Sequence, residues 1–157
     1  MAIRNIRKDD EILRKQSREV TVFDDRLHQL LDDMAETMAS VNGVGLAAVQ
    51  VGALRRALII DVGDGVVELI NPTITKRSET ELSEREGCLS FPGEWGMVNR
   101  PESLTVTAQN RCGDMFTLEG EGLFARAVCH EVDHLNGIVF KDIATEMVDP
   151  YDEDVMD

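Results

Sequence analysis

The sequence lacks the features that point to a membrane or a nucleic acid. Its 157 residues include 16 Lys and Arg against 30 Asp and Glu, a formal net charge of −14. This charge disfavours phosphate backbones and anionic lipid surfaces, which are bound by clustered cationic side chains. No apolar run approaches the roughly 20 residues that a membrane-spanning helix needs. We therefore expect no direct nucleic-acid binding and no membrane association.

Cysteine is scarce as well. The chain has three cysteines, Cys88, Cys112 and Cys129, and an odd number in a chain of this size argues against a framework of disulfides. The first eight residues contain no apolar stretch of the kind found in a secretory signal peptide. These absences indicate a reducing compartment, and we expect a cytoplasmic protein.

The size and composition predict one folded domain over residues 1–157. Hydrophobic residues make up 43% of the chain, which is enough for a packed core. The only strong change in composition lies at about residues 142–157, where no Lys or Arg follows Lys141 and seven acidic residues occur. We expect an acidic, solvated tail there.

Two segments have the periodicity of helices. Residues 24–39 carry leucines and methionines at helical spacing, behind Asp24 or Asp25 as a cap. Residues 121–136 are apolar on more than one side and are followed by Gly137, a common helix stop. A helix of this second kind is usually buried between other elements.

The segments between the helices are short and strand-like. The runs 57–62 and 66–70 flank a glycine-rich turn at 63–65, and the runs 104–108 and 115–118 flank a second turn at 110–114. Residues 79–86 alternate less regularly. This order predicts an α+β fold with antiparallel sheets around the buried helix of the C-terminal half.

The residues 130–134 form an H-E-x-x-H motif within that helix. Residues four apart lie about 40° from each other around a helix, so His130 and His134 can bind the same metal ion. Glu131 lies at the edge of this face, where a base acting on metal-bound water is required. Two of the three histidines of the chain stand here, which favours a metal site over a core pair.

Two histidines leave a catalytic metal site one protein ligand short. Cys88, within the segment 86–90, is the best third ligand by residue type. Cys112 lies in a predicted turn. Cys129 precedes the first histidine of the motif and points about 100° away from it, so a small buried hydrophobic role suits Cys129 better.

The glycine-rich segment 43–50 is ambiguous by itself. It lacks the Lys of a phosphate-binding loop and the spacing of a dinucleotide-binding loop. A tight turn with small packing residues would explain it. Its one polar side chain, Gln50, can donate a hydrogen bond to an oxyanion.

Taken together, the segments 43–50, 86–90 and 130–134 closely resemble the three motifs of bacterial peptide deformylase. They stand in the family's order and at similar separations, so the resemblance spans nearly the whole chain. It implies a compact α+β fold with antiparallel sheets around the central motif helix. It also implies a metal-dependent hydrolase of protein biosynthesis that processes the N-terminal methionine.

The resemblance assigns roles to particular residues. It implies Cys88, His130 and His134 as metal ligands, with Fe²⁺ as the usual ion and Zn²⁺, Ni²⁺ or Co²⁺ as substitutes. Glu131 becomes the acid and base that activates the metal-bound water for attack on the formyl carbon of N-formyl-methionyl chains, which releases formate. The oxyanion is then held by the Gln50 side chain and the backbone N–H of Leu89.

The same resemblance places Gly45 along the substrate cleft, where it would pair with the peptide backbone. Apolar residues suit a methionine side chain, and the candidates for the pocket wall are Val44, Leu89, Leu123 and Ala127. Ordinary core packing explains each of these equally well. Arg126 could line the pocket with its stem while its charge reaches water. Trp95 stands where some relatives carry a basic residue, which puts contacts to the rest of the peptide in doubt.

Two supporting contacts follow from the chemistry of such a site. Glu86 can accept a hydrogen bond from a ligand histidine and fix its tautomer. Asp133, on a buried helix, needs a partner, and Arg100 is a plausible one.

Two other readings use the same motif. A peptidase would take a downstream Glu as its third ligand, and Glu153 has a suitable spacing but lies among other acids. A structural zinc module would be closed by a fourth ligand from Cys112 or Cys129.

The nascent chain is the expected partner. Since the C-terminal region is acidic, we expect no ribosome docking through a basic C-terminal helix.

Overall fold

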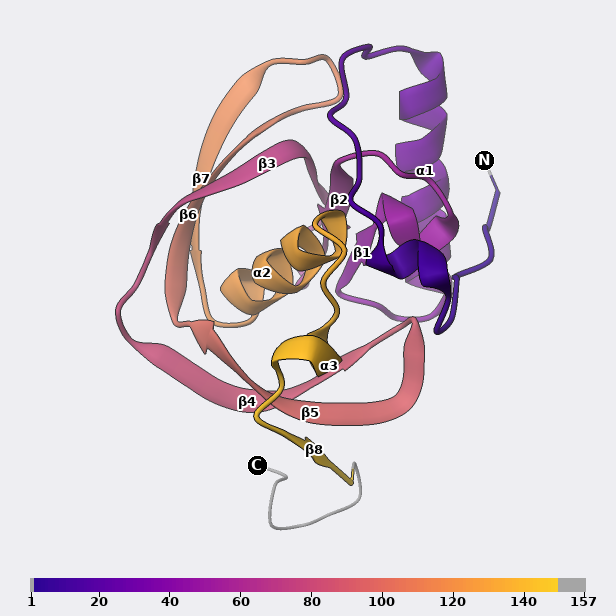
Figure 1. The fold of residues 1–157 in the computed structure, drawn as a ribbon. Helices are drawn as coiled ribbons and strands as arrows, with labels where there is room; N and C mark the ends of the chain where they lie inside the picture. Colours follow the sequence, from indigo (N-terminus) through magenta and orange to yellow (C-terminus); the bar gives the residue numbers. More distant parts are fainter. Residues whose placement is uncertain (1, 150–157) are drawn as a thin grey trace.

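The computed structural model describes residues 2–149, in which antiparallel strands form two sheets around one helix (Figure 1). The first sheet has the order β1-β2-β3-β6-β7 and the second has the order β4-β5-β8. The strands of the first sheet are β1 (Gly45–Ala47), β2 (Ala57–Ile60), β3 (Val67–Arg77), β6 (Ser103–Gln109) and β7 (Met115–Glu121). Those of the second are β4 (Glu81–Cys88), β5 (Phe91–Pro101) and β8 (Glu146–Val148). The α+β class and the antiparallel sheets are confirmed.

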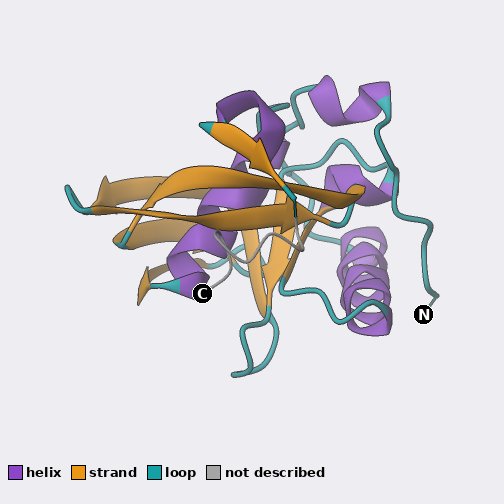
Figure 2. Cartoon of the chain, turned by 90° about the horizontal axis from the view of Figure 1, so that it is seen from below, coloured by secondary structure: helices purple, strands orange, loops and turns teal. Residues whose placement is uncertain are grey.

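The helix α2 (Leu123–Leu135) lies between the two sheets, as the two views together show (Figures 1 and 2). It begins after Gly122 and ends just before Gly137, and both glycines have positive φ, at 61° and 76°. Ten of its residues are buried, among them the whole segment 125–132. The predicted helix over 121–136 is therefore confirmed, although Glu121 belongs to β7.

A second helix, α1 (Asp25–Ser40), covers the other face of β1 and β2. Asp24 caps it, because its side chain accepts a hydrogen bond from the backbone N–H of Leu27 at 3.1 Å. Its leucines and methionines bury their side chains against the sheet, in a cluster formed by Leu27, Leu30, Leu31, Met34, Met38, Leu46, Ile59 and Ile70. This packing holds β1 and the following 3₁₀ turn η2 (Ala48–Val51) in place.

Both predicted hairpins are present. Ile60 pairs with Val67 across the turn at 63–65, and Gln109 pairs with Met115 across the turn at 110–114. Gly63 and Gly65 adopt φ values of 111° and 100°, which only glycine tolerates at little cost. The sequence therefore specified these turns through residues that the backbone geometry requires.

The structure contains three strands that the sequence did not predict, β1, β5 and β8. β5 contains two prolines and two glycines, which normally lower the expectation of a strand. It is nevertheless held by β4 on one side and by β8 on the other. The predicted acidic tail contributes β8 and the end of α3 (Phe140–Ile143), while its residues 150–157 lie outside the described part.

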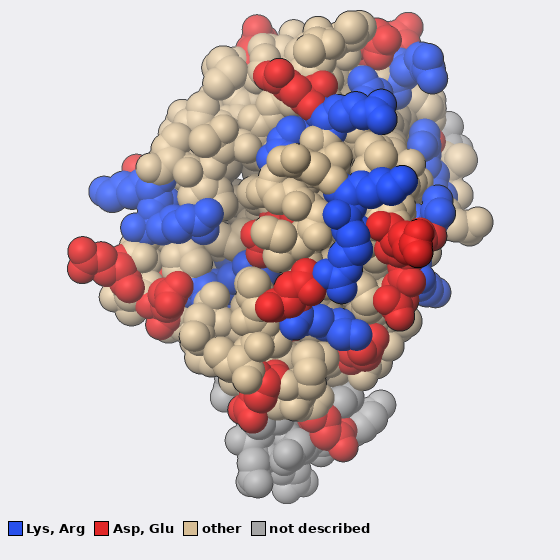
Figure 3. All heavy atoms as spheres, viewed as in Figure 1, with Lys and Arg blue, Asp and Glu red and all other residues tan. Residues whose placement is uncertain are grey.

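One face of this molecule mixes charges of both signs. On the face in Figure 3, cationic and acidic side chains lie among one another rather than in separate fields. Arg14 pairs with Asp142, and Lys141 pairs with Glu94 at 2.6 Å. Among residues 2–149, no helix has the length and apolar character needed to cross a bilayer.

Candidate metal centre

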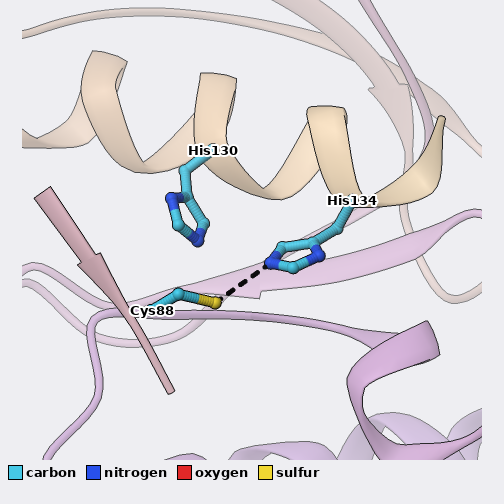
Figure 4. A group of neighbouring side chains, drawn as sticks. All are labelled: Cys88, His130 and His134. Carbon is cyan, nitrogen blue, oxygen red and sulfur yellow. Dashed lines mark hydrogen bonds between the residues drawn. The ribbon is translucent and has the colours of Figure 1, made fainter. Parts of the chain in front are cut away.

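Three side chains from distant parts of the sequence converge at the centre of the fold. Cys88 ends β4, and His130 and His134 lie one turn apart on α2 (Figure 4). One ligand atom from each of them lies within 4.8 Å of the others. The Cys88 Sγ and the His134 Nε2 are 3.3 Å apart, and the two imidazole centroids are 5.0 Å apart. The sulfur and both rings point toward one another.

The donor set suits a divalent transition metal. Thiolate and imidazole are ligands of Zn²⁺ and Fe²⁺, and three protein donors are typical of a catalytic site that keeps one position open. His134 is fully buried, and its Nδ1 has no hydrogen-bond partner within the described part of the chain. Burial lowers the pKa of His134 well below its usual value, so its ring is neutral and can donate a lone pair to a metal.

The ring of His130 is oriented by Glu86. The His130 Nδ1 donates to the Glu86 Oε2 at 2.6 Å, which leaves Nε2 directed at the other two donors. Burial acts to lower the pKa of His130, but the carboxylate of Glu131 and contacts with Cys88 and Glu86 outweigh it and raise the pKa. The expected hydrogen bond between Glu86 and a histidine of the motif is confirmed.

Glu86 itself is held by two buried arginines. Arg100 donates to both of its oxygens, at 3.1 and 2.7 Å, and Arg126 donates to its Oε1 at 3.0 Å. Burial would raise the pKa of Glu86, but the hydrogen bonds with His130 and Arg100 lower it strongly, so the carboxylate stays charged. Arg100 also pairs with Asp133 at 2.7 Å, which confirms the expected contact.

The Glu131 carboxylate lies beside the three converging side chains. It is 4% exposed, and its Oε1 has no hydrogen-bond partner among residues 2–149. Burial raises its pKa to about 7. A Cβ added to Gly45 would stand 2.7 Å from the Glu131 Oε2, so only glycine leaves room for this carboxylate.

Gln50 approaches the site from η2 and is 1% exposed. Its Oε1 accepts a hydrogen bond from the Ala47 backbone N–H at 2.9 Å, which directs its Nε2 to the opposite side. That nitrogen donates to the Ser90 Oγ at 3.2 Å and lies 3.7 Å from the Cys88 Sγ. An amide donor is thus aimed at the ligand cluster.

A cleft of about 900 Å³ opens onto these residues. It contains the sequence-predicted residues other than the fully buried His134, namely Val44, Gly45, Gln50, Cys88, Leu89, Leu123, Arg126, Ala127, His130 and Glu131. Val44 and Leu123 are 42% and 53% exposed, so both present apolar surface to it. Trp95 also lines the cleft and packs so closely on Gly87 that a Cβ there would be 2.8 Å from its ring.

The expectation for Arg126 was wrong in one respect. Arg126 lines the cleft, but its guanidinium is buried and does not reach water. It donates to Glu86 and to the carbonyls of Leu82 and Val98. The buried carboxylate provides a stronger partner than solvent, and sequence spacing alone gave no signal of it.

The other cysteines do not join the cluster. Cys112 is exposed, and the buried Cys129 accepts a hydrogen bond from Arg77 at 3.5 Å. Within residues 2–149, Cys88, His130 and His134 are the only group whose ligand atoms come close enough to share an ion. A closed four-ligand zinc module therefore has no support. Glu153, the third ligand of the alternative peptidase, lies outside the described residues.

Comparisons with known proteins agree with this geometry. The family model described as polypeptide deformylase matches residues 3–149. A peptide deformylase of Caldicellulosiruptor bescii is 58% identical over 143 residues, covering 90% of this chain and 86% of that protein. One of Acetivibrio thermocellus is 57% identical over 150 residues, covering 95% of this chain and 88% of that protein.

This chain is also similar to solved structures of peptide deformylases. The peptide deformylase of Thermotoga maritima has a TM-score of 0.89 and 41% identity, covering 92% of this chain and 99% of that one. That of Ehrlichia chaffeensis in complex with actinonin has a TM-score of 0.90 and 36% identity, with 93% and 91% of the two chains covered.

Proposed function

This chain belongs to the polypeptide deformylase family, and we propose that the residues converging in its cleft carry out that family's reaction. The enzyme removes the N-formyl group from nascent peptides, and peptide deformylases are metalloenzymes. The reaction breaks the C–N bond of a formamide, forms a C–O bond with water, and yields formate and a free amine. The observation that carries the assignment of residues is the meeting of Cys88, His130 and His134 next to Glu131.

We assign the three donors to one divalent ion, Fe²⁺ in the cell, with Zn²⁺, Ni²⁺ or Co²⁺ as substitutes in purified protein. When bound, such an ion would lower the pKa of a coordinated water and polarise the formyl carbonyl. The buried His134 supports this assignment, because its Nε2 lies 3.3 Å from the Cys88 Sγ and burial keeps the ring neutral and able to donate a lone pair.

Glu131 is the acid and base of the proposed mechanism. Its carboxylate takes a proton from the attacking water and returns it to the leaving amine nitrogen. Its Oε2 lies 4.0 Å from the His130 Nε2, which supports this role. The oxyanion that forms on the formyl oxygen would be stabilised by the Gln50 Nε2 and the backbone N–H of Leu89.

The cleft would bind the methionine end of the substrate. We propose that Val44, Leu123 and Ala127 contact the methionine side chain, together with the aliphatic stem of Arg126. Gly45, at the start of β1, would pair with the peptide backbone. The apolar surface that Val44 and Leu123 expose in the cleft supports this orientation.

We further infer a cytoplasmic enzyme that forms one domain over residues 1–157 and meets its substrates as they emerge from the ribosome. We do not assign docking there to residues 142–157, which carry seven acidic residues and no Lys or Arg. We also propose that the chain does not bind nucleic acid directly.

Formate release from a formyl-methionyl dipeptide tests the mechanism. Protein purified without oxygen should be active and should contain about one metal ion per chain. Glu131→Gln should lose at least about 100-fold in kcat while retaining the metal, because a general base contributes roughly that much. Glu119→Gln, an exposed residue of β7, is the control and should keep full activity. Equal activity of Glu131→Gln and the native enzyme would remove Glu131 from its role.

A further inference from the structure

The side-chain amide of Gln50 is fixed at both of its ends. Its Oε1 must face the Ala47 N–H, because only the oxygen can accept that hydrogen bond. Its Nε2 carries two hydrogens, and the Ser90 Oγ lies 3.2 Å from this nitrogen. The other neighbour of the nitrogen is the Cys88 Sγ, at 3.7 Å.

The Ser90 hydroxyl is placed to act on this amide. It is fully buried, two residues after Cys88, in the turn between β4 and β5. A serine hydroxyl in a core is usually retained for its hydrogen bonds, since an apolar residue of that size would pack at lower cost. Within residues 2–149, the Ser90 hydroxyl accepts a hydrogen bond from the Gln50 Nε2.

The backbones that carry the two side chains are held by one segment. The N–H of Arg7 donates to the carbonyl of Gln50 at 2.6 Å, and the N–H of Asp9 donates to the carbonyl of Ser90 at 3.0 Å. Gln50 and Ser90 therefore have a common support, which fixes the distance between the amide and the hydroxyl.

We propose that Ser90 is a positioning residue for the deformylation reaction. Its hydroxyl binds one Nε2 hydrogen of Gln50 and so directs the second hydrogen toward the cleft beside Cys88. Without substrate, the sulfur is the nearest acceptor of that second hydrogen. In the transition state the charged formyl oxygen is a stronger acceptor than the sulfur, so the second Nε2 hydrogen of Gln50 binds this oxygen instead. This inference rests on the proposed role of Gln50 as an oxyanion donor.

A double-mutant cycle tests the coupling. Ser90→Ala should lower kcat by roughly threefold to tenfold, the range expected when a positioning hydrogen bond is lost, with little change in KM. Gln50→Ala should lower it by roughly 100-fold to 1,000-fold. Ser90→Ala should then cause no further loss in the Gln50→Ala background. Ser83→Ala, at an exposed position of β4, is the control and should leave kcat unchanged.

The outcomes separate the two proposals. If Gln50→Ala keeps its activity, Gln50 is not an oxyanion donor, and the proposal for Ser90, which depends on it, is wrong as well. If Gln50→Ala is impaired and Ser90→Ala lowers kcat by the same factor in both backgrounds, Ser90 acts by another route and the inference is overturned. An unchanged kcat in Ser90→Ala overturns it as well.

A second readout does not depend on turnover. In zinc-loaded protein labelled with ¹⁵N-glutamine, the Gln50 side-chain amide should give two proton signals, one of them protected from exchange by Ser90. In Ser90→Ala that protection should disappear, with metal content and melting temperature close to those of the native protein. Unchanged protection would contradict the proposed hydrogen bond, whereas a general loss of structure would broaden or shift signals throughout the protein.

Discussion

Gly45 and Glu131 are so close that the smallest side chain on Gly45 would collide with the carboxylate. The added Cβ would lie 2.7 Å from the Glu131 Oε2 and 3.1 Å from its Cγ. Because β1 is held between α1, α2 and β2, the backbone of Gly45 has little freedom to retreat. The glycine of β1 thus sets the position of the proposed base on α2.

We expect Gly45→Ala to displace Glu131 and lower kcat by roughly 10-fold to 100-fold, since a shift of about 1 Å at a reacting group can cost that much. Formate release and metal analysis would measure this. In a Glu131→Asp background the contact of 2.7 Å with Oε2 is removed and only the looser contact with Cγ remains, so the alanine should cost less there. An equal loss in both backgrounds would show that Gly45 acts independently of Glu131.

The pair of buried arginines predicts a large effect at Glu86. Glu86→Gln removes the charge between Arg100 and Arg126, so both buried cations lose their shared buried carboxylate, although Arg100 keeps Asp133. Breaking a buried ion pair typically costs about 3–5 kcal/mol of unfolding free energy. It also weakens the support of His130, for which a 10-fold to 100-fold loss of metal affinity is expected. Urea unfolding and metal titration measure the two effects.

Glu84→Gln is the matched control, because Glu84 lies on the same strand with its side chain half exposed, 3.4 Å from Arg126. It should change stability by less than about 0.5 kcal/mol. Similar losses in the two variants would mean that the buried network does not distinguish Glu86.

Asp33 predicts an acid-sensitive contribution to stability. Burial acts to raise its pKa, but hydrogen bonds from the Ala2 N–H, Gln29 and Arg4 outweigh it and hold the pKa below 3.8. A carboxyl with a lowered pKa stabilises the fold above the unfolded value of 3.8 and loses this contribution as pH falls through its lower, folded value.

The stability difference between the native protein and Asp33→Asn should therefore be constant at neutral pH and shrink below about pH 4. Denaturant unfolding at several pH values measures it. Asp64→Asn, in the exposed turn before β3, is the control. A difference that grows on acidification would contradict the assignment.

Metal removal is expected to lower the melting temperature. An ion that binds only the folded state adds about 4 kcal/mol when its free concentration is 1,000 times its Kd. A chelator should remove that stabilisation from the native protein. Cys88→Ala, which lacks one of the three proposed ligands, should melt at nearly the same temperature with and without chelator. A large chelator effect in this variant would place the ion elsewhere.

The sequence predicted those parts of the site that depend on local periodicity. His130 and His134 face the same side because they are four residues apart on a helix, and this spacing is independent of the rest of the fold. Cys88 was identified by residue type and by the resemblance to a family. Its approach to His134 depends on the pairing of β4 with β5, which no local pattern contains.

The features of the fold and the site that the sequence did not predict depend on tertiary contacts. β5 carries prolines and glycines that argue against a strand, and only its two neighbouring strands explain it. Arg126 is expected from its sequence position to extend toward solvent, but a buried carboxylate from another strand binds it instead. Ser90 belongs to a recognised motif, yet its contact with Gln50 spans 40 residues of sequence.

The hydrogen bonds from the segment 7–9 to the carbonyls of Gln50 and Ser90 have a consequence for biosynthesis. This segment leaves the ribosome early, whereas its second acceptor and α2 are made much later. Both of its contacts become possible once Ser90 has been made, a little over halfway along the chain, whereas α2, with His130 and His134, follows later. A translation product that stops before α2 could therefore hold the segment 7–9 in place, but it would lack His130, Glu131 and His134 and would be inert.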